Sequence, residues 1–102
     1  MRVEAIEWLS AAERDLDAMF AARLESSEVA AHEFLEMVEH ALALLAVFPE
    51  LGSIYSRPFR RFLLKDRNIG LFYTLEGRRL FVHILFDLRQ NPKSLRERLR
   101  SQ

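Results

Sequence analysis

Residues 57–91 read RPFRRFLLKDRNIGLFYTLEGRRLFVHILFDLRQN, and this stretch contains three β-type segments separated by turn-length gaps. The gaps contain Lys65-Asp66-Arg67-Asn68 and Leu75-Glu76-Gly77-Arg78. Asn68 and Gly77 tolerate the positive φ that tight hairpin loops require. The stretch therefore predicts an antiparallel three-stranded meander around which the rest of the chain is organised. The predicted strands are Phe59–Lys65, Asn68–Leu75 and Arg78–Leu88.

Loops of two residues also predict which face of the meander each side chain occupies. With a Glu76-Gly77 loop, the expected pairs on the core face are Tyr73 with Leu80, Leu71 with Val82 and Ile69 with Ile84. An Asp66-Arg67 loop adds Phe62 and Leu64 to that face, and a shift of one residue there would exchange Arg61 and Phe62. The opposite face, called the far face below, is expected to carry Phe59, Arg61, Leu63, Lys65, Phe72, Arg79, Phe81, His83, Leu85 and Asp87.

The far face is predicted to be apolar and basic at once. Antiparallel sheets ordinarily have one packed face and one polar face, so Leu63, Phe72, Phe81 and Leu85 require a cover. We expect a partner protein to supply that cover. The alternative is the C-terminal tail of the same chain, which is long enough to reach the face.

The composition indicates one compact domain spanning residues 1–102. Half of the 102 residues are hydrophobic and eight are Phe, which is enough for a single core. The absence of Cys excludes a disulfide framework and a thiolate metal site. The sequence contains neither a signal-peptide pattern nor an apolar run long enough to span a bilayer, so we expect a cytoplasmic protein.

The charge is distributed unevenly although the net charge is zero. Residues 1–55 contain 3 Lys or Arg and 11 Asp or Glu, whereas residues 56–102 contain 12 and 4. The sheet and the tail are therefore expected to form a basic surface that attracts phosphates or an acidic peptide. The alternative is that the two halves of the chain neutralise each other within the fold.

Two helices are predicted before the meander. A short strand at Arg2–Trp8 leads to Ser10-Ala11-Ala12-Glu13, a capping box that predicts a helix from Ala11. The second helix is expected from Glu28 to Phe48, where Pro49 stops it. Both helices are amphipathic, so they are expected to cover the core face as a hairpin.

After the meander, Asn91-Pro92 predicts the start of a short C-terminal helix with Leu95 and Leu99 on its apolar side. The fold class is thus α+β in the order β-α-α-β-β-β, with the helical hairpin on one face of a small, mainly antiparallel four-stranded sheet. Glu36 and His40 are four residues apart and are interpreted as a solvated ion pair, so no metal or cofactor is expected.

Several short groups of residues carry a family resemblance through their order and spacing. They are Ala12, Asp15-Leu16, Leu45 to Phe48-Pro49 with Gly52, Arg60–Leu64, Asn68–Tyr73, Arg79–Phe86 and Arg89. In this order they resemble the RelE/ParE superfamily of toxins from bacterial type II toxin–antitoxin systems, over nearly the whole chain. The resemblance implies the β-α-α-β-β-β fold and an antitoxin that wraps the toxin in a hetero-oligomer.

Members of this superfamily inhibit growth in different ways, and the fold does not choose between them. RelE-like members resemble ribosome-dependent mRNA endoribonucleases, which need a base for the 2′-hydroxyl, an acid for the leaving oxygen and cations for the phosphate charge. ParE-like members resemble inhibitors of DNA gyrase that act by binding alone. A paralogue that has lost toxicity is a third hypothesis.

The residues after the last strand favour the ParE-like interpretation. Ribonuclease members tend to keep a Tyr or His there, whereas this chain has Leu88–Pro92 followed by the basic tail Lys93–Arg100. If the chain is nevertheless a ribonuclease, the candidate catalytic residues are Arg61, Lys65, Arg79, His83, Asp87 and Arg89. The candidate residues for binding a target or an antitoxin are Phe59, Arg61, Leu63, Phe72, Phe81, Leu85 and Arg89.

Overall fold

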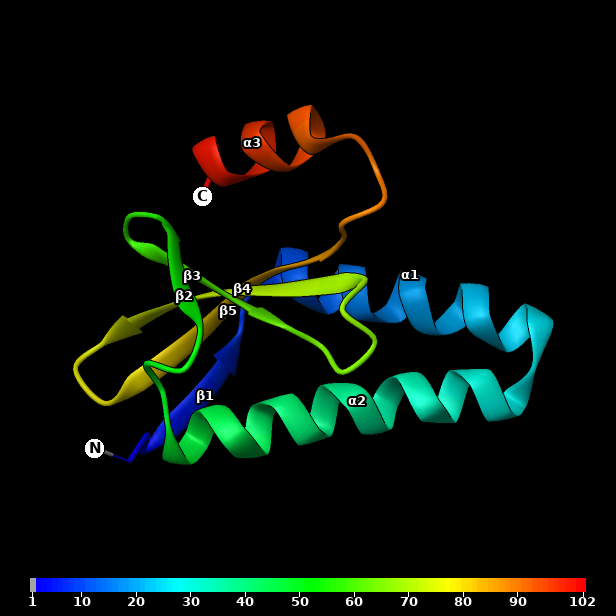
Figure 1. Ribbon diagram of the computed structural model, residues 1–102, viewed down its shortest axis with the longest axis horizontal. Coiled ribbons are helices and arrows are strands. Elements are labelled where there is room, and N and C mark those ends of the chain that lie inside the picture. Colours follow the sequence, from blue (N-terminus) through cyan, green and yellow to red (C-terminus); the bar gives the residue numbers. More distant parts are fainter. Residues whose placement is uncertain (1) are drawn as a thin grey trace.

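The computed structural model describes residues 2–102, and Figure 1 shows two long helices, a twisted sheet and a short C-terminal helix. The elements are β1 (Ala5–Trp8), α1 (Ser10–Ser26), α2 (Glu28–Val47), β2 (Ser53–Ser56), β3 (Phe59–Leu63), β4 (Ile69–Glu76), β5 (Arg79–Asp87) and α3 (Pro92–Arg100). The strand order is β1-β5-β4-β3-β2, with β1 parallel to β5 and the other neighbours antiparallel. The predicted α+β class is confirmed, but the sheet formed by residues 2–102 has five strands rather than four.

The additional strand is β2, which lies between the second helix and the predicted meander, where the sequence predicts no strand. It pairs antiparallel with β3 through Ser53 opposite Arg61 and Ile54 opposite Arg60. All four of its residues are exposed. Its sequence, SIYS, has no alternation of apolar and polar side chains that would predict a strand. β2 forms one edge of the sheet and β1 forms the other.

The two long helices form an antiparallel hairpin on one face of the sheet (Figure 1). Between them, the Ser27 hydroxyl caps α2 by accepting a hydrogen bond from the Ala30 amide at 3.2 Å. The capping box predicted at Ser10 is wrong, because α1 already begins at Ser10 and its N-cap is Leu9. The Leu9 amide donates to the Val82 carbonyl, which brings the start of the helix directly to the end of β1.

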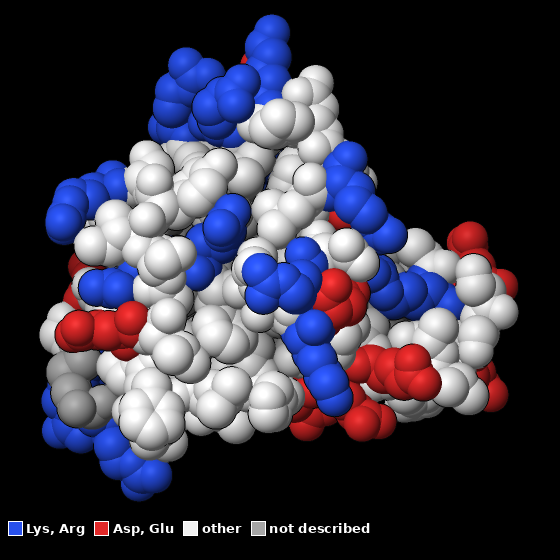
Figure 2. All heavy atoms as spheres, viewed as in Figure 1, with Lys and Arg blue, Asp and Glu red and all other residues white. Residues whose placement is uncertain are grey.

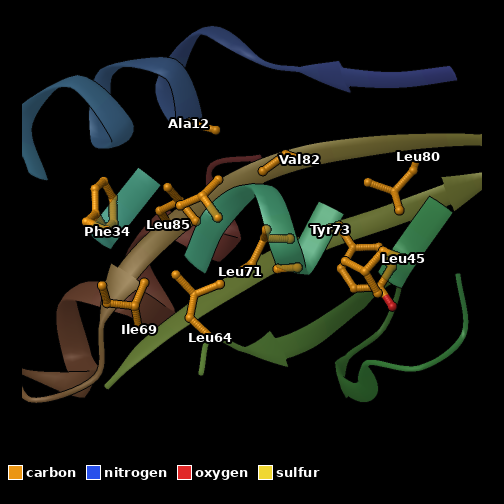
Figure 3. Close-up of a cluster of buried hydrophobic side chains, with 12 residues drawn as sticks. Ala12, Phe34, Leu45, Leu64, Ile69, Leu71, Tyr73, Leu80, Val82 and Leu85 are labelled. Carbon is orange, nitrogen blue, oxygen red and sulfur yellow. The ribbon is translucent and has the colours of Figure 1, made fainter. Parts of the chain in front are cut away.

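Side chains from the helix hairpin and the sheet form the main core, called the hairpin core below (Figure 3). Its buried members are Ala12, Phe34, Val38, Ala41, Leu45, Leu64, Ile69, Leu71, Tyr73, Leu80, Val82 and Leu85. The predicted pairing across Asp66-Arg67 is confirmed, since Phe62 pairs with Leu71 and the Leu64 amide donates to the Ile69 carbonyl. Burying this many aliphatic and aromatic side chains is the main favourable contribution to folding.

A bulge in β5 reverses the faces of the residues that follow it. The β4–β5 loop is Gly77-Arg78, so Tyr73 pairs with Val82, and the extra residue His83 then separates Val82 from Ile84. The predicted pairs across Glu76-Gly77 are therefore wrong. Ile84 lies on the far face, and Leu85, predicted for the far face, lies in the hairpin core.

The far face is covered in part by α3, which Figure 1 shows on the side of the sheet opposite α2. The buried residues beneath and within it, called the α3 core, are Phe59, Phe72, Ile84, Phe86, Leu95 and Leu99. We expected a partner protein to cover this face, and that expectation is wrong for the part under α3. The tail of the same chain supplies the cover through two leucines spaced one helical turn apart.

Candidate functional site

The predicted binding residues of the far face differ in how accessible they are. Phe59 is 8% exposed and Phe72 is fully buried, so both belong to the α3 core rather than to a free surface. Leu85 is buried in the hairpin core and cannot contact a partner. Leu63 and Phe81 are half-buried and reach solvent on β3 and β5.

Arg61 lies on β3, next to the edge strand β2. Its guanidinium lies over the ring of Tyr55, with the central carbon 5.3 Å from the ring centroid. The Tyr55 ring in turn meets Phe72 edge-on at 5.3 Å. Among the side chains of residues 2–102, Arg61 Nε is a buried nitrogen without a hydrogen-bond partner. This arginine is held by stacking rather than by a carboxylate, so its charge is not neutralised by an ion pair.

A groove separates β2 from α3 on this face. Its volume is about 620 Å³, and it is lined by Tyr55, Ser56, Arg57, Phe59, Arg96, Leu99 and Arg100. The lining contains three arginines and no carboxylate, and none of the three has an ion pair within residues 2–102. We call this the arginine groove; its positive potential favours an anionic ligand.

His83, the histidine proposed as a proton carrier, is occupied by two structural contacts. Its Nε2 is 2.9 Å from the Thr74 hydroxyl and its Nδ1 is 3.1 Å from Gln102 Oε1. Because the Gln102 carbonyl oxygen accepts, Nδ1 carries the hydrogen in this arrangement and Nε2 accepts from Thr74. The ring also packs edge-on against Phe59 at 5.1 Å. Both ring nitrogens are therefore engaged, one with β4 and the other with Gln102, which follows α3.

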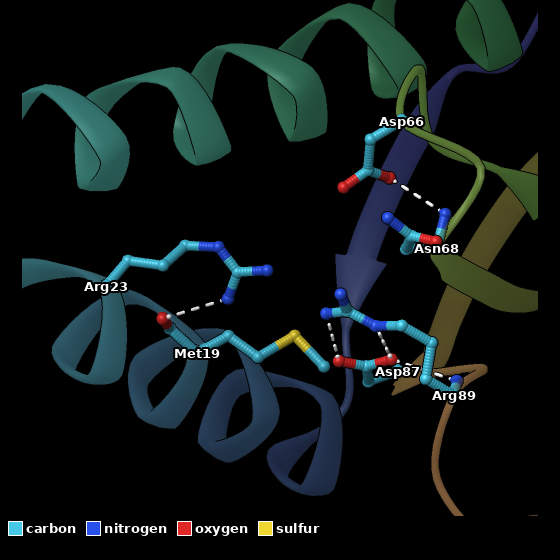
Figure 4. A network of polar contacts seen from close by, with 6 residues as sticks. All are labelled: Met19, Arg23, Asp66, Asn68, Asp87 and Arg89. Carbon is cyan, nitrogen blue, oxygen red and sulfur yellow. Dashed lines mark hydrogen bonds and ion pairs between the residues drawn. The ribbon is translucent and has the colours of Figure 1, made fainter. Parts of the chain in front are cut away.

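Asp87 and Arg89 form a closed pair at the other end of β5 (Figure 4). Arg89 donates from Nε at 3.0 Å and from Nη2 at 2.8 Å to the two oxygens of Asp87, and its amide donates to Oδ1 at 2.9 Å. These hydrogen bonds lower the pKa of Asp87 below its ordinary value and raise the pKa of Arg89. Asp87 is thus stabilised as an anion and is poorly suited to donate a proton.

The six candidate catalytic residues are not brought together. His83 contacts the C-terminal end of α3, whereas Asp87 lies on the α1 side of the sheet, close to Arg23 and Met19 (Figure 4). Arg79 begins β5 and is paired with Glu7 of β1, about 26 Å along the strand from Asp87. The bulge at His83 separates His83 from Asp87, because it ends the alternation that put both residues on one predicted face.

Lys65, the remaining candidate cation, lines a different cleft. This cleft has a volume of about 730 Å³ and lies between the helix hairpin and the β3–β4 turn. Its charged lining residues are Arg23, Glu33, Glu36, Lys65 and Asp66, and His40 lies among them. Acidic and basic groups are mixed there, so the cleft shows no charge preference for one class of ligand.

The predicted separation of charge is visible on the surface. Figure 2 shows Lys and Arg side chains over α3 and the sheet and Asp and Glu side chains along the helix hairpin. Within residues 2–102 the structure contains no group of three or more residues that could ligate a metal ion. None of its helices combines the length and the apolar character needed to cross a membrane.

The sequence does not predict the arginine groove, although Phe59 in its lining is among the predicted binding residues. No role is predicted for Tyr55 or Arg57, and Arg96 and Arg100 are predicted only as part of the basic tail. The i, i+4 spacing of Arg96 and Arg100 predicts that they share one side of a helix, and this was the available signal.

The chain is similar to known proteins at the levels of sequence and fold. Residues 6–91 match the family described as "ParE toxin of type II toxin-antitoxin system, parDE". The fold is similar to a solved chain described as "Chromosomal ParDE TA system from P. aeruginosa", with a TM-score of 0.70 and 14% sequence identity. That match covers 82% of this chain and 95% of the other. No curated protein sequence matches.

Proposed function

We propose that this chain, which belongs to the ParE toxin family of type II toxin–antitoxin systems, inhibits growth by binding DNA gyrase and is neutralised by a cognate antitoxin. Membership of the family makes it a toxin component with an antitoxin partner; gyrase as the target is the proposed step. A gyrase target also implies that the toxin acts in the cytoplasm.

The observation that carries the proposal is the state of the two candidate proton carriers. RNA cleavage would need a base and an acid on opposite sides of one phosphate. His83 uses both ring nitrogens for Thr74 and Gln102, and Asp87 is held as an anion by Arg89 on the α1 side of the sheet. Inhibition by binding requires neither group, and therefore agrees better with this arrangement.

The basic end of the molecule is the proposed contact with gyrase. Arg89 is exposed, and the side chains of Lys93, Arg96 and Arg100 are exposed on α3. Charged groups on an interface rim mainly accelerate association and fix orientation. Arg89→Glu should therefore weaken inhibition chiefly by slowing association, and the effect should diminish at high salt.

The test compares two activities of the same purified toxin. One assay follows supercoiling by DNA gyrase, and the other follows cleavage of a defined mRNA on ribosomes. The expected result is inhibited supercoiling with intact mRNA, both for the natural chain and for His83→Ala. Arg89→Glu should raise the toxin concentration needed for inhibition, while Arg2→Glu, the same charge change away from the tail, should not.

The RelE-like alternative predicts the opposite pattern. Ribosome-dependent cuts with unaffected supercoiling would overturn the proposal and direct attention to the cations of the far face. A loss of cutting in a folded His83→Ala variant would then identify His83 as part of a ribonuclease site.

A further inference from the structure

The two walls of the arginine groove carry charge of one sign. The first wall is β2 with the turn into β3, and residues 53–63 contain no Asp or Glu. The second wall is α3, whose one acidic residue, Glu97, is not in the lining. Arg57, Arg96 and Arg100 are exposed and have no ion pair within residues 2–102. Walls of one sign concentrate ligands of the opposite charge, so the groove is suited to an anion.

The rest of the lining is largely apolar and aromatic. Phe59 and Leu99 line the groove and are each only 8% exposed, because they belong to the α3 core. Tyr55 remains 40% exposed, and the guanidinium of Arg61 lies over its ring. A ligand that fits this lining carries anionic groups for the arginines and a flat apolar group for Tyr55. Nucleotides combine the two, since each has a phosphate and a base with a π-face.

The spacing of the arginines suits a strand better than a single nucleotide. Arg96 and Arg100 project from one side of α3 and are about 6 Å apart along its axis, which is comparable to the spacing of successive phosphates in an extended strand. Arg57 lies on the other wall, so a mononucleotide would offer one phosphate to three arginines. The volume of about 620 Å³ is that of a small-ligand site, which a single strand can enter and a duplex cannot.

We propose that the arginine groove binds a short single-stranded segment of DNA, with phosphates on Arg57, Arg96 and Arg100 and an unpaired base against Tyr55. A basic groove with an aromatic side chain is the common design of sites that bind single strands without reading their sequence. None of the six candidate ribonuclease residues lines the groove, so this site is separate from that hypothesis.

The inference goes beyond binding to gyrase. A DNA site on the toxin would let it contact a strand of the DNA on which its proposed target acts. The inference rests on the proposed function only for the choice of DNA over RNA, because phosphates and a base are common to both.

An acidic polypeptide fits the groove less well. Asp and Glu carboxylates would pair with the arginines, but their short aliphatic stems offer no flat group to cover Tyr55. Each nucleotide of a strand brings its own base, so pairing with the arginines and contact with the ring occur together.

The first experiment measures binding of a fluorescent oligothymidine of about twelve nucleotides to the full chain by anisotropy. Binding should weaken with salt, and the slope of log K against log salt should be about −2 for three phosphate contacts. A duplex of the same length, polyglutamate and thymidine monophosphate should each compete at least about tenfold less well than unlabelled oligothymidine. No binding, equal competition by any of these three, or competition by oligouridine that is about tenfold stronger would overturn the proposal.

Variants of the two walls identify the site. Arg100→Glu on α3 and Arg57→Glu outside it should each weaken oligothymidine binding at least about tenfold. Tyr55→Leu keeps an apolar side chain without the ring, and should weaken binding at least about fivefold, the loss of one stacked base. Lys93→Glu is the matched control, because it reverses a charge on α3 outside the groove lining. An equal loss in Lys93→Glu, or unchanged binding in Tyr55→Leu, would overturn the proposal.

Binding to gyrase is measured separately, by calorimetry with DNA-free enzyme and by the supercoiling assay. If the toxin binds and inhibits gyrase but does not bind oligothymidine, only the DNA site is wrong. If it binds oligothymidine through the groove but neither binds nor inhibits gyrase, only the proposed target is wrong.

Discussion

Asp15 of α1 and Arg98 of α3 form a two-point ion pair, with both N–O distances at 2.9 Å, although 83 residues separate them in sequence. Asp15 Oδ2 also accepts a hydrogen bond from the Leu85 amide at 3.0 Å. One carboxylate thus connects the first helix, strand β5 and the last helix. The pair is partly shielded from water, because the side chains of Arg98 and Asp15 are 31% and 17% exposed.

Arg98→Ala should lower the free energy of unfolding by about 1–2 kcal/mol, because it leaves a partly buried carboxylate with only the Leu85 amide as a partner. The loss should be concentrated in α3, whose amides should exchange faster with solvent. Chemical denaturation and hydrogen exchange measure the two effects. Lys93→Ala removes a charge from the same helix, and Lys93 forms no ion pair within residues 2–102, so a comparable loss in that control would contradict the role of Asp15.

Tyr73→Phe should destabilise the protein by about 1–3 kcal/mol, since it removes one hydroxyl that serves two buried partners. The hydroxyl donates to the Pro49 carbonyl at 2.6 Å and accepts from the Gly52 amide at 3.0 Å. Thermal or urea unfolding measures the change. Tyr55→Phe is the control, because Tyr55 is 40% exposed, and it should change stability by less than about 0.5 kcal/mol.

The same tyrosine predicts a loss of stability in alkali. Burial raises the pKa of Tyr73, so between about pH 10 and its folded-state pKa the folded chain retains a proton that the unfolded chain has released. Stability contributed by neutral Tyr73 is therefore complete below pH 10 and is lost as the pH rises above it. Urea midpoints measured from pH 8 upward should fall less steeply for Tyr73→Phe than for the natural chain, and parallel curves would contradict this assignment.

Asp87 predicts a corresponding effect in acid. Its hydrogen bonds from Arg89 lower its folded-state pKa, so the contribution of this pair is present above the unfolded-state pKa near 4 and is lost as the pH falls through the lower folded-state pKa. The effect should be small, because Arg89 is exposed to solvent. Asp87→Asn should flatten the dependence of unfolding on pH below about 4, and NMR titration of the Asp87 carboxyl provides a direct check.

Gly77→Ala should cost about 1–2 kcal/mol for conformational reasons alone. Gly77 has φ of 62°, a conformation that disfavours a side chain, and an added Cβ would meet no atom within 4 Å. Gly77→Asn should cost less, because Asn tolerates this conformation. Equal losses in the two variants, measured by denaturation, would mean that the cost comes from contacts rather than from the backbone.

Much of the fold could be predicted because local chemistry decides it. Pro49 ends the second helix, and the Asp66-Arg67 turn fixes the pairing of Phe62 with Leu71. The bulge at His83 could not be predicted, since no Gly marks it and the residues that follow, Ile84 to Phe86, are apolar whichever face each occupies. Strand β2 could not be predicted because its pairing depends on β3 rather than on its own pattern.

The candidate site was harder to predict because it depends on where the tail lies. The sequence predicted a helix with Leu95 and Leu99 on one side, but its position is set by Phe59, Phe72 and the ion pair to Asp15. The roles of His83 depend in the same way on Gln102. Contacts between residues so far apart in the chain leave no local sequence signal.

The bulge in β5 affects how this protein should be compared with its relatives. Ile84, Leu85 and Phe86 are consecutive and all buried, because after the extra residue they alternate between the α3 core and the hairpin core. A relative without the extra residue would direct the side chain aligned with Leu85 to the opposite face of its sheet. Residues after position 83 should therefore be matched to those of a relative by superposing the two structures. A role transferred by position in a gapless sequence alignment would be assigned to the opposite face of the sheet.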